Sequence, residues 1–243
     1  MIKYIISNNI LEIYNYEFTK KGRGSSKGIY NRDSFSGITK TNNYNITKKN
    51  RRDTIRRLAT INFNNKDSNF WTFTFKDDIK DIKIANNLFH KFIDRLKYYI
   101  LTYTDFDIFK FKYLGVIEFQ DTFGRGVIHY HCLINMPFID KKILQDKIWK
   151  LGICYVTRIN DIDNLGAYLI KYMSKDTNDI RLMGEKGYVY SLNLERPQEF
   201  QNFTEFYKNG GYRFKDCKPI YNSEYLTEHL GECKYSQYNL NRC

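Results

Sequence analysis

Two histidines separated by one residue lie in a segment with the composition of a buried β-strand. The segment is Gly126-Val-Ile-His-Tyr-His-Cys-Leu-Ile-Asn135, in which apolar residues flank His129 and His131 on both sides. Side chains alternate between the two faces of a strand, so residues i and i+2 point to the same face. The strand therefore presents two imidazoles side by side, which is a way to hold one divalent metal ion.

A third ligand is predicted on the preceding strand. Glu118 is the only charged residue in the apolar run Leu114–Phe119, and a buried carboxylate is costly unless it is paired or bound to a metal. The turn Asp121–Gly126 predicts a hairpin, which brings residue 118 roughly opposite residues 129–131. Two imidazoles and one carboxylate, with open positions for a phosphate, suit Mg²⁺ or Mn²⁺ as a Lewis acid. The predicted metal ligands are Glu118, His129 and His131.

A candidate nucleophile follows in Tyr168-Leu-Ile-Lys-Tyr-Met-Ser-Lys175. Tyr168 and Tyr172 are four residues apart, so they share one face of a helix. Lys171 and Lys175 each lie three residues after a tyrosine, where an ammonium favours the phenolate or stabilises phosphate charge. The alternative is an ordinary amphipathic helix with its tyrosines against a sheet and its lysines in water. Tyr168 and Tyr172 are both candidate nucleophiles, and Tyr172 is preferred because Lys175 closes the motif.

The periodicity of the chain predicts an α+β fold. Strands are expected near residues 70–75, 111–119, 127–135, 153–159 and 188–194, and helices near 80–101, 140–151 and from 161 or 163 to 175. The first helix has an apolar stripe made of Ile84, Leu88, Phe92, Leu96 and Tyr99. This order, with a hairpin, indicates an antiparallel sheet of about five strands with helices packed on one face.

Three regions are expected along the chain. Residues 69–195 form the predicted core. Residues 1–68 carry 14 Lys/Arg against 5 Asp/Glu and are either a basic DNA-binding arm or a solvated segment. Residues 196–243 are weakly patterned and form an extension of unknown role. The candidate DNA contacts are Arg51, Arg52, Arg56 and Arg57, together with Arg125 in the hairpin turn.

The charge of the chain favours a polyanionic partner. The formal net charge is +12 and 17% of the residues are aromatic, a combination that suits binding to single-stranded nucleic acid, although an AT-rich coding sequence gives a similar composition. The five cysteines form no C-x-x-C pair, so we expect no disulfide framework and a reducing compartment. No apolar run is long enough to span a bilayer, so a cytoplasmic protein without membrane contact is expected. The stretch Gly22–Gly28 lacks the spacing of a phosphate-binding loop, so unwinding of DNA would need a partner.

Three motifs together resemble those of the rolling-circle replication initiators. The segments are Leu-Gly-Val-Ile-Glu-Phe119, Ile-His-Tyr-His-Cys-Leu-Ile134 and Ala-Tyr-Leu-Ile-Lys-Tyr-Met-Ser-Lys175, and the strand Trp71-Thr-Phe-Thr-Phe75 resembles the first motif of that family. These proteins are the HUH endonucleases of plasmids and of small single-stranded DNA viruses and phages. The form with two tyrosines is most similar to replication proteins of small DNA phages. Tyr130 departs from the pattern, because a bulky hydrophobic residue is usual there.

The resemblance implies a ferredoxin-like (RRM-like) endonuclease core and a tyrosine-based mechanism. A metal would hold the scissile phosphate of single-stranded DNA at a replication origin, and a tyrosine would attack it to give a 5′-phosphotyrosine and a free 3′-OH. A host polymerase and helicase would be the partners. A relaxase or single-strand transposase would have the same chemistry, although relaxases commonly place the tyrosine near the N-terminus. The residues are also compatible with a non-catalytic nucleic-acid-binding protein or with a metal hydrolase that uses water.

Overall fold

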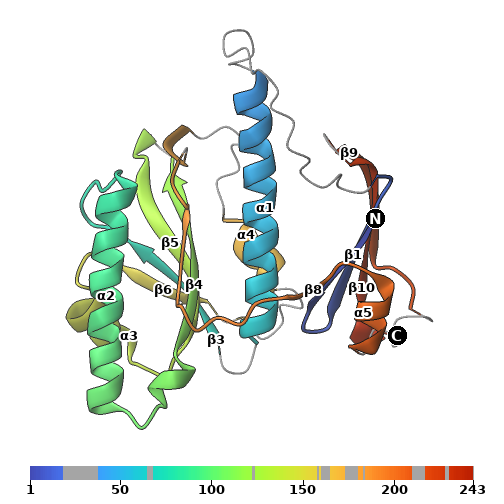
Figure 1. Ribbon diagram of the computed structural model, residues 1–243. Coiled ribbons are helices and arrows are strands. Elements are labelled where there is room, and N and C mark those ends of the chain that lie inside the picture. Colours follow the sequence, from blue (N-terminus) through green and yellow to red (C-terminus); the bar gives the residue numbers. More distant parts are fainter. Residues whose placement is uncertain are drawn as a thin grey trace, which may run out of the picture. The chain divides into compact units, whose positions relative to one another are not determined.

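The computed structural model describes the parts of the chain that carry the predicted core. These are residues 1–18, 38–64, 68–121, 124–157, 159, 165–172, 180–182, 184–209, 217–227 and 230–242. Their backbone divides into two compact units (Figure 1): residues 1–40 with 196–243, and residues 41–195. The ten strands within the described residues form two five-stranded antiparallel sheets, so the expected α+β fold is confirmed.

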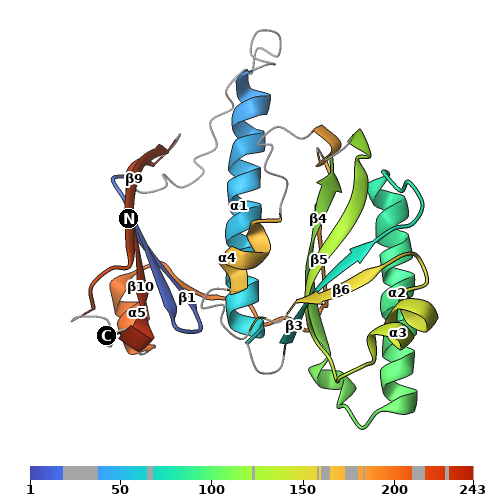
Figure 2. The ribbon, with the colours of Figure 1, turned by 180° about the vertical axis from the view of Figure 1, so that it is seen from behind.

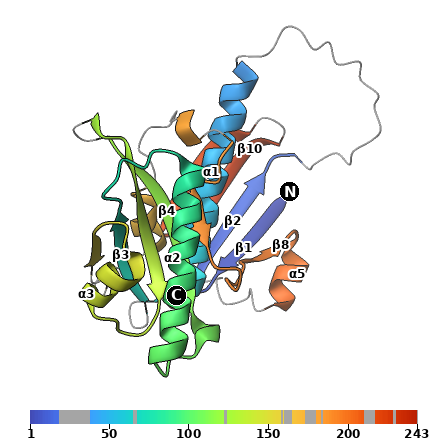
Figure 3. The same ribbon diagram turned by 90° about the vertical axis from the view of Figure 1, so that its left-hand side faces the viewer.

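The first unit is a sheet built from both ends of the chain. Its elements are β1 (Ile2–Ser7), β2 (Ile10–Tyr16), β8 (Gln198–Phe200), α5 (Phe203–Lys208), β9 (Tyr221–Thr227), β10 (Gly231–Asn239) and the 3₁₀ turn Leu240–Arg242. The strand order is β8-β1-β2-β10-β9, and α5 lies beside β1 and β8 (Figure 3). This sheet was not expected, since both ends were treated as extensions. A signal was present, because Ile2–Ser7 and Ile10–Tyr16 flank a two-residue turn in which Asn8 adopts a positive φ of 56°.

The second unit contains the predicted core. Its elements are α1 (Ile38–Asn62, from residue 41), β3 (Ser68–Thr74), α2 (Ile82–Tyr103), η1 (Ile108–Lys110), β4 (Lys112–Gln120), β5 (Val127–Asn135), α3 (Lys141–Ile143), η3 (Leu144–Trp149), β6 (Cys154–Thr157), α4 (Leu165–Ile170), η4 (Ile180–Leu182) and β7 (Tyr188–Tyr190). The sheet order is β6-β3-β5-β4-β7. Residues 41–62, which the sequence grouped with an N-terminal extension, lie in this unit.

Helices cover both faces of this second sheet, which corrects the expectation that they cover one (Figures 1 and 2). On one face, α2 and η3 pack against odd-numbered residues of β3 and β4 and even-numbered residues of β5, among them Phe73, Ile117 and Tyr130. On the other face, α1 and α4 pack against Phe70, Leu114, Val116 and Leu133. Because the strand period is two, His129 and His131 share the face that α1 and α4 cover.

The expected elements differ from the observed ones mainly at their ends. Helix α2 begins at Ile82, where Asp81 caps it by accepting from the amide of Ile84, and Ile84 itself is 54% exposed, so its place in the apolar stripe was wrong. The helix expected over residues 140–151 is capped by Asp140 and passes into a π-turn that ends at Lys150, whose φ is 63°.

The cysteines are mostly free thiols. Cys132, Cys154 and Cys233 are free and buried, whereas Cys217 forms a disulfide. The expectation of reduced thiols is therefore wrong for Cys217. Within the described part of the chain, no helix has both the length and the apolar character needed to cross a bilayer.

Candidate active site

The β4–β5 hairpin brings the three predicted metal ligands together. In its register Glu118 is paired with His129 and Val116 with His131, so the expected position of residue 118 opposite the histidines is confirmed. Gly124 and Gly126 close the turn with φ values of 74° and 61°, conformations that glycine adopts without steric cost. One carboxylate and two imidazoles therefore project from adjacent strands to the same face of the sheet.

The three side chains lie within ligand distance of one another. The Glu118, His129 and His131 ligand atoms are all within 4.8 Å of each other, and His131 Nε2 lies 2.6 Å from Glu118 Oε2. The His131 side chain is only 6% exposed, whereas that of Glu118 is 37% exposed. The cluster thus has one buried wall and one side open to solvent, and this donor set could hold a divalent metal ion.

A hydrogen bond from the neighbouring strand orients His131. The Nδ1 atom of His131 lies 3.0 Å from Thr72 Oγ1 on β3, and Thr72 is paired with His131 in the sheet. When Nδ1–H donates to this hydroxyl, Nε2 keeps its lone pair and faces Glu118. Metal-binding histidines commonly use their second nitrogen in this way. Thr72 was not predicted as a site residue, although its phase in the alternating run Phe70–Phe75 places it on the correct face.

The environment of His129 favours its neutral form. Burial lowers the pKa of His129, His131 and Arg125 lower it further, and Glu118 acts in the opposite direction. A neutral imidazole is the form that binds metals. Tyr130, between the two histidines, points to the opposite face, where it stacks on Phe89 with ring centroids 4.4 Å apart and donates to Asn86 Oδ1.

Both candidate tyrosines lie against the cluster. The Tyr172 ring stacks on the imidazole of His131, with centroids 4.1 Å apart and an interplanar angle of 23°. Its hydroxyl donates to the hydroxyl of Tyr168 at 3.0 Å. Phe70 contacts both tyrosine rings, at centroid distances of 4.9 and 5.2 Å. The expectation that the two tyrosines share one side of the helix therefore holds, and Tyr172 is the one in contact with a predicted metal ligand.

The helix that carries the tyrosines is shorter than expected within the described residues. It spans Leu165–Ile170, and the next two amides bond to carbonyls three residues back, Lys171 to Tyr168 and Tyr172 to Leu169. This tighter turn places Tyr172 beside the cluster. The expected start at Asp161 or Asp163 lies outside the described residues, as does the segment 173–179.

Helix α1 fixes the position of α4. Gly166 is packed so closely against α1 that an added Cβ would lie 2.5 Å from the carbonyl oxygen of Arg56. Leu165 and Leu169 are buried in the same core as Ile55 and Leu58. The absence of a side chain at residue 166 therefore lets the two helix backbones approach each other.

The hydroxyl of Tyr172 has a strongly raised pKa. Burial, the hydrogen bond with Tyr168, the charge of Tyr168 and the charge of Glu118 together raise the pKa of Tyr172 to about 12. The phenol is therefore protonated at neutral pH in this arrangement.

The two predicted lysines differ in what the structure says of them. Lys171 is exposed, and its Nζ lies 5.6 Å from the centroid of the Tyr168 ring, so its ammonium lies near the tyrosine pair. Lys175 lies outside the described residues.

The predicted arginines occupy different environments. Arg51 donates from Nη2 to the carbonyl of Glu185 at 2.9 Å, and Arg52 is exposed. Arg56 Nη2 lies 3.5 Å from Asp53 Oδ1 and the Arg56 side chain is only 14% exposed. Arg56 therefore belongs more to the packing of α1 than to an open surface.

The remaining two arginines also have partners in the protein. Arg57 is partly buried and makes contacts of its own. Arg125 Nη2 lies 2.6 Å from Asp78 Oδ1, and both side chains are largely exposed. An exposed ion pair of this kind is weak, so Arg125 can exchange its partner for a phosphate at small cost.

Comparison with known proteins agrees with this site. Residues 68–177 match the model of a replication-associated protein family, that of ORF2 and the gene 2 protein. The match supports a replication initiator protein. It covers less than half of the chain but contains Glu118, both histidines and both tyrosines. No curated protein and no solved structure matches the chain.

Proposed function

We propose that this protein initiates replication by nicking and rejoining single-stranded origin DNA through a covalent tyrosine intermediate. The observation that carries the proposal is the contact between the Tyr172 ring and the His131 imidazole, beside the carboxylate of Glu118. A candidate nucleophile and a candidate Lewis-acid site lie next to each other, on elements within the segment that matches the replication-associated family. The proposed enzyme is a site-specific single-stranded DNA endonuclease and strand transferase.

Glu118, His129 and His131 would hold Mg²⁺ or Mn²⁺. A bound ion of this kind supplies Lewis-acid polarisation of the scissile phosphate. The donor set fits the ion because its three ligand atoms converge within 4.8 Å and Thr72 holds the second nitrogen of His131. Burial of His131 behind Tyr172 keeps water from that side of the cluster.

The tyrosine performs the bond exchange in this proposal. The Tyr172 oxygen forms a bond to phosphorus, the bond between phosphorus and the 3′ oxygen breaks, and a 5′-phosphotyrosine remains. The phenol releases its proton, and the 3′ oxygen takes up a proton to become the hydroxyl that a polymerase extends. Lys171, and Lys175 further along the chain, are the proposed groups that favour the phenolate and stabilise phosphate charge.

The pair of tyrosines suits a second strand transfer. Tyr168 lies in hydrogen-bond contact with Tyr172, so a second phenol is at hand while the first holds DNA. Attack of the free 3′-OH on the phosphotyrosine reverses the first step and rejoins the strand. A replicon of a phage or plasmid would use both reactions, with a host polymerase and helicase as partners.

Covalent capture of DNA tests the proposal. The full-length protein is incubated with a library of single-stranded oligonucleotides and Mn²⁺, and the attached DNA is detected on denaturing gels and mapped by mass spectrometry. We expect an adduct at Tyr172 that disappears in Tyr172→Phe, in His129→Ala, in His131→Ala and with chelator. Tyr98→Phe, an exposed tyrosine on α2, is the matched control and should keep the adduct.

Two outcomes would contradict the mechanism. An adduct of undiminished yield in the Tyr168→Phe/Tyr172→Phe double variant would remove the tyrosines as nucleophiles. Metal-dependent cleavage by the wild-type protein without any adduct would identify water as the nucleophile instead.

A further inference from the structure

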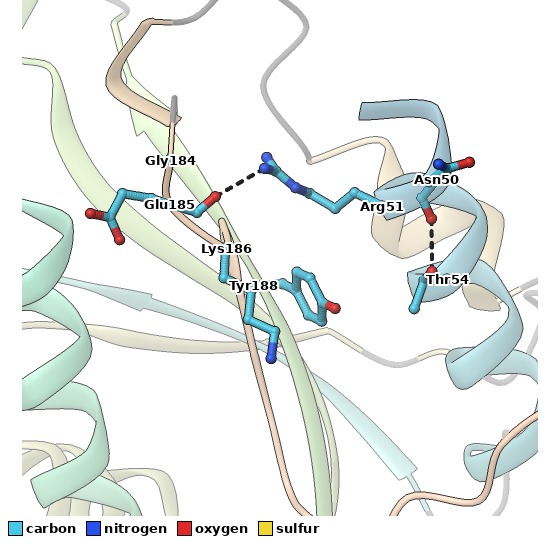
Figure 4. Close-up of a pocket in the computed structure, with 7 residues that line it drawn as sticks. All are labelled: Asn50, Arg51, Thr54, Gly184, Glu185, Lys186 and Tyr188. Atoms are coloured by element: carbon cyan, nitrogen blue, oxygen red, sulfur yellow. Dashed lines mark hydrogen bonds between the residues drawn. The ribbon is translucent and has the colours of Figure 1, made fainter. Parts of the chain in front are cut away.

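A second polar cavity lies on the same side of the sheet as the metal cluster. It has a volume of about 490 Å³ and is lined by Asn50, Arg51 and Thr54 of α1 and by the segment 184–188 that leads into β7 (Figure 4). Cavities of this size accommodate small ligands. All of its lining residues belong to the unit formed by residues 41–195. The cavity is therefore built by the same body that carries the candidate active site.

The register of the sheet relates this cavity to the cluster. His131 is paired with Val116, and Val116 is paired with Tyr188. Paired residues point to the same face, so His131 and Tyr188 lie in one row across the sheet, with one strand between them. Two strand spacings correspond to about 10 Å. A nucleotide in the cavity would therefore be a close neighbour of one whose phosphate lies at the cluster.

Two cations give the cavity a positive wall. Among the described residues, the carbonyl of Glu185 is the one acceptor that Arg51 contacts, so further guanidinium N–H groups can donate to a phosphate. Lys186 donates to the hydroxyl of Tyr190 at 2.8 Å and has two more donors on its ammonium. The carboxylate of Glu185 points away from Arg51 (Figure 4) and lies 3.8 Å from Lys83, so it does not neutralise this wall.

A tyrosine supplies the flat surface of the cavity. The partly buried Tyr188 lines it and is backed by Tyr190, with ring centroids 5.6 Å apart and an interplanar angle of 23°. Gly187, whose φ is 67°, lets the chain pass Arg51, because an added Cβ would lie 3.1 Å from Arg51 Nη1. A guanidinium, an ammonium and an aromatic ring therefore converge on one space.

We propose that this cavity binds one nucleotide of the single-stranded DNA substrate, a neighbour of the nucleotide whose phosphate is attacked. Arg51 and Lys186 contact the phosphate, and the ring of Tyr188 packs against the base. Its place along the substrate rests on the proposed nicking function, but the binding of single-stranded DNA in the cavity does not. Contacts of this kind tolerate any base, because every base has an aromatic face.

Equilibrium binding tests the cavity without any cleavage. The full-length protein is titrated with a fluorescent single-stranded oligonucleotide of mixed sequence in the presence of EDTA, over a range of salt concentrations. We expect Tyr188→Ala to weaken binding roughly 5- to 100-fold without changing the salt dependence, since the residue is uncharged. Arg51→Ala and Lys186→Ala should each lower the slope of log K against log salt by about 0.7. Tyr98→Ala and Lys97→Ala, exposed on α2, are the matched controls.

A second measurement separates base contact from a loss of folding. Tyr188→Phe keeps the ring and should bind as the wild type does, whereas Tyr188→Leu fills the space without an aromatic face and should bind as Tyr188→Ala does. Single abasic sites are then placed along the oligonucleotide. One position should weaken binding to the wild type but not to Tyr188→Ala, a non-additivity that identifies direct contact.

The outcomes distinguish this proposal from the nicking mechanism. Equal affinities for Tyr188→Ala and Tyr98→Ala, or an abasic effect that persists in Tyr188→Ala, would overturn the nucleotide site even if the protein nicks DNA. The expected affinities and slopes, found in a protein that forms no covalent adduct, would support the site and leave the tyrosine mechanism refuted.

Discussion

Thr72 has a larger part in the cluster than its neutral side chain suggests. Its hydroxyl lies 3.0 Å from Nδ1 of His131, while the other nitrogen of that ring faces Glu118. Loss of the hydroxyl would leave a buried ring nitrogen without a partner and would remove the preference for the tautomer that exposes a lone pair at Nε2. Outer partners of this kind commonly contribute to metal affinity as well as to geometry.

Substitution of Thr72 should weaken metal binding without unfolding the protein. Thr72→Val keeps the β-branched shape that suits a strand, and we expect the Kd for Mn²⁺, measured by calorimetry, to rise about 10- to 100-fold. Thr74→Val is the matched control, because Thr74 lies on the same strand face and donates to the carbonyl of Ile153 rather than to a histidine. Equal affinities in the two variants would show that the hydroxyl of Thr72 has no effect on the metal.

The three ligands were predictable from the sequence because they depend on local rules. A strand period of two and a short turn are sufficient to place Glu118, His129 and His131 together. Thr72 and Tyr188 were not identified, because they join the same row only through pairing with strands far away in the sequence. Nothing in their local pattern distinguishes them from other residues of alternating strands.

At the scale of elements, the contact between α1 and α4 determines where the tyrosines lie. Gly166 faces the backbone of Arg56, and the helix that begins there carries Tyr168 and leads directly to Tyr172. The sequence predicted α2 and the β4–β5 hairpin well, because each has a regular apolar pattern. It did not predict which face α1 and α4 would cover, since that depends on complementary shapes such as the space left by Gly166.

A methyl group at residue 166 should separate the two helices. We expect Gly166→Ala to lower the free energy of unfolding by about 1–3 kcal/mol in chemical denaturation, as overpacked cores commonly do, despite the higher helix propensity of alanine. Covalent capture of DNA should fall because Tyr172 moves.

The affinity for Mn²⁺ serves as the internal control in that variant. All three metal ligands lie on the β4–β5 hairpin, so Gly166→Ala should leave the affinity unchanged. A variant as stable and as active as the wild type would show that α4 has room to accept the methyl group without displacement.

At the scale of the whole molecule, the chain divides its chemistry unevenly between two units. The cluster, both tyrosines and the nucleotide cavity lie within residues 41–195. The sheet of the other unit joins residues 1–40 to residues 196–243. Pairing between β2 and β10, more than 200 residues apart, could not be inferred from either end alone, because each end supplies only part of the sheet.

A fragment should retain the metal site. We expect residues 38–195, expressed alone, to bind Mn²⁺ with the affinity of the full chain, because the ligands and the cores around them come from this segment. Calorimetry on the fragment and on its His131→Ala variant provides the measurement and its control. A folded fragment, shown by circular dichroism, that binds no metal would mean that the first unit is needed to shape the cluster.

The three metal ligands come from one hairpin, and only 13 residues separate Glu118 from His131. Such a site can form as soon as two neighbouring strands pair, whereas Tyr172 arrives only when a later segment has docked. During synthesis or refolding, the chain could therefore acquire its ion before it acquires its nucleophile. Early occupation would protect the amides of β4 and β5 from hydrogen exchange, and a partly folded chain would hold metal without being able to cut DNA.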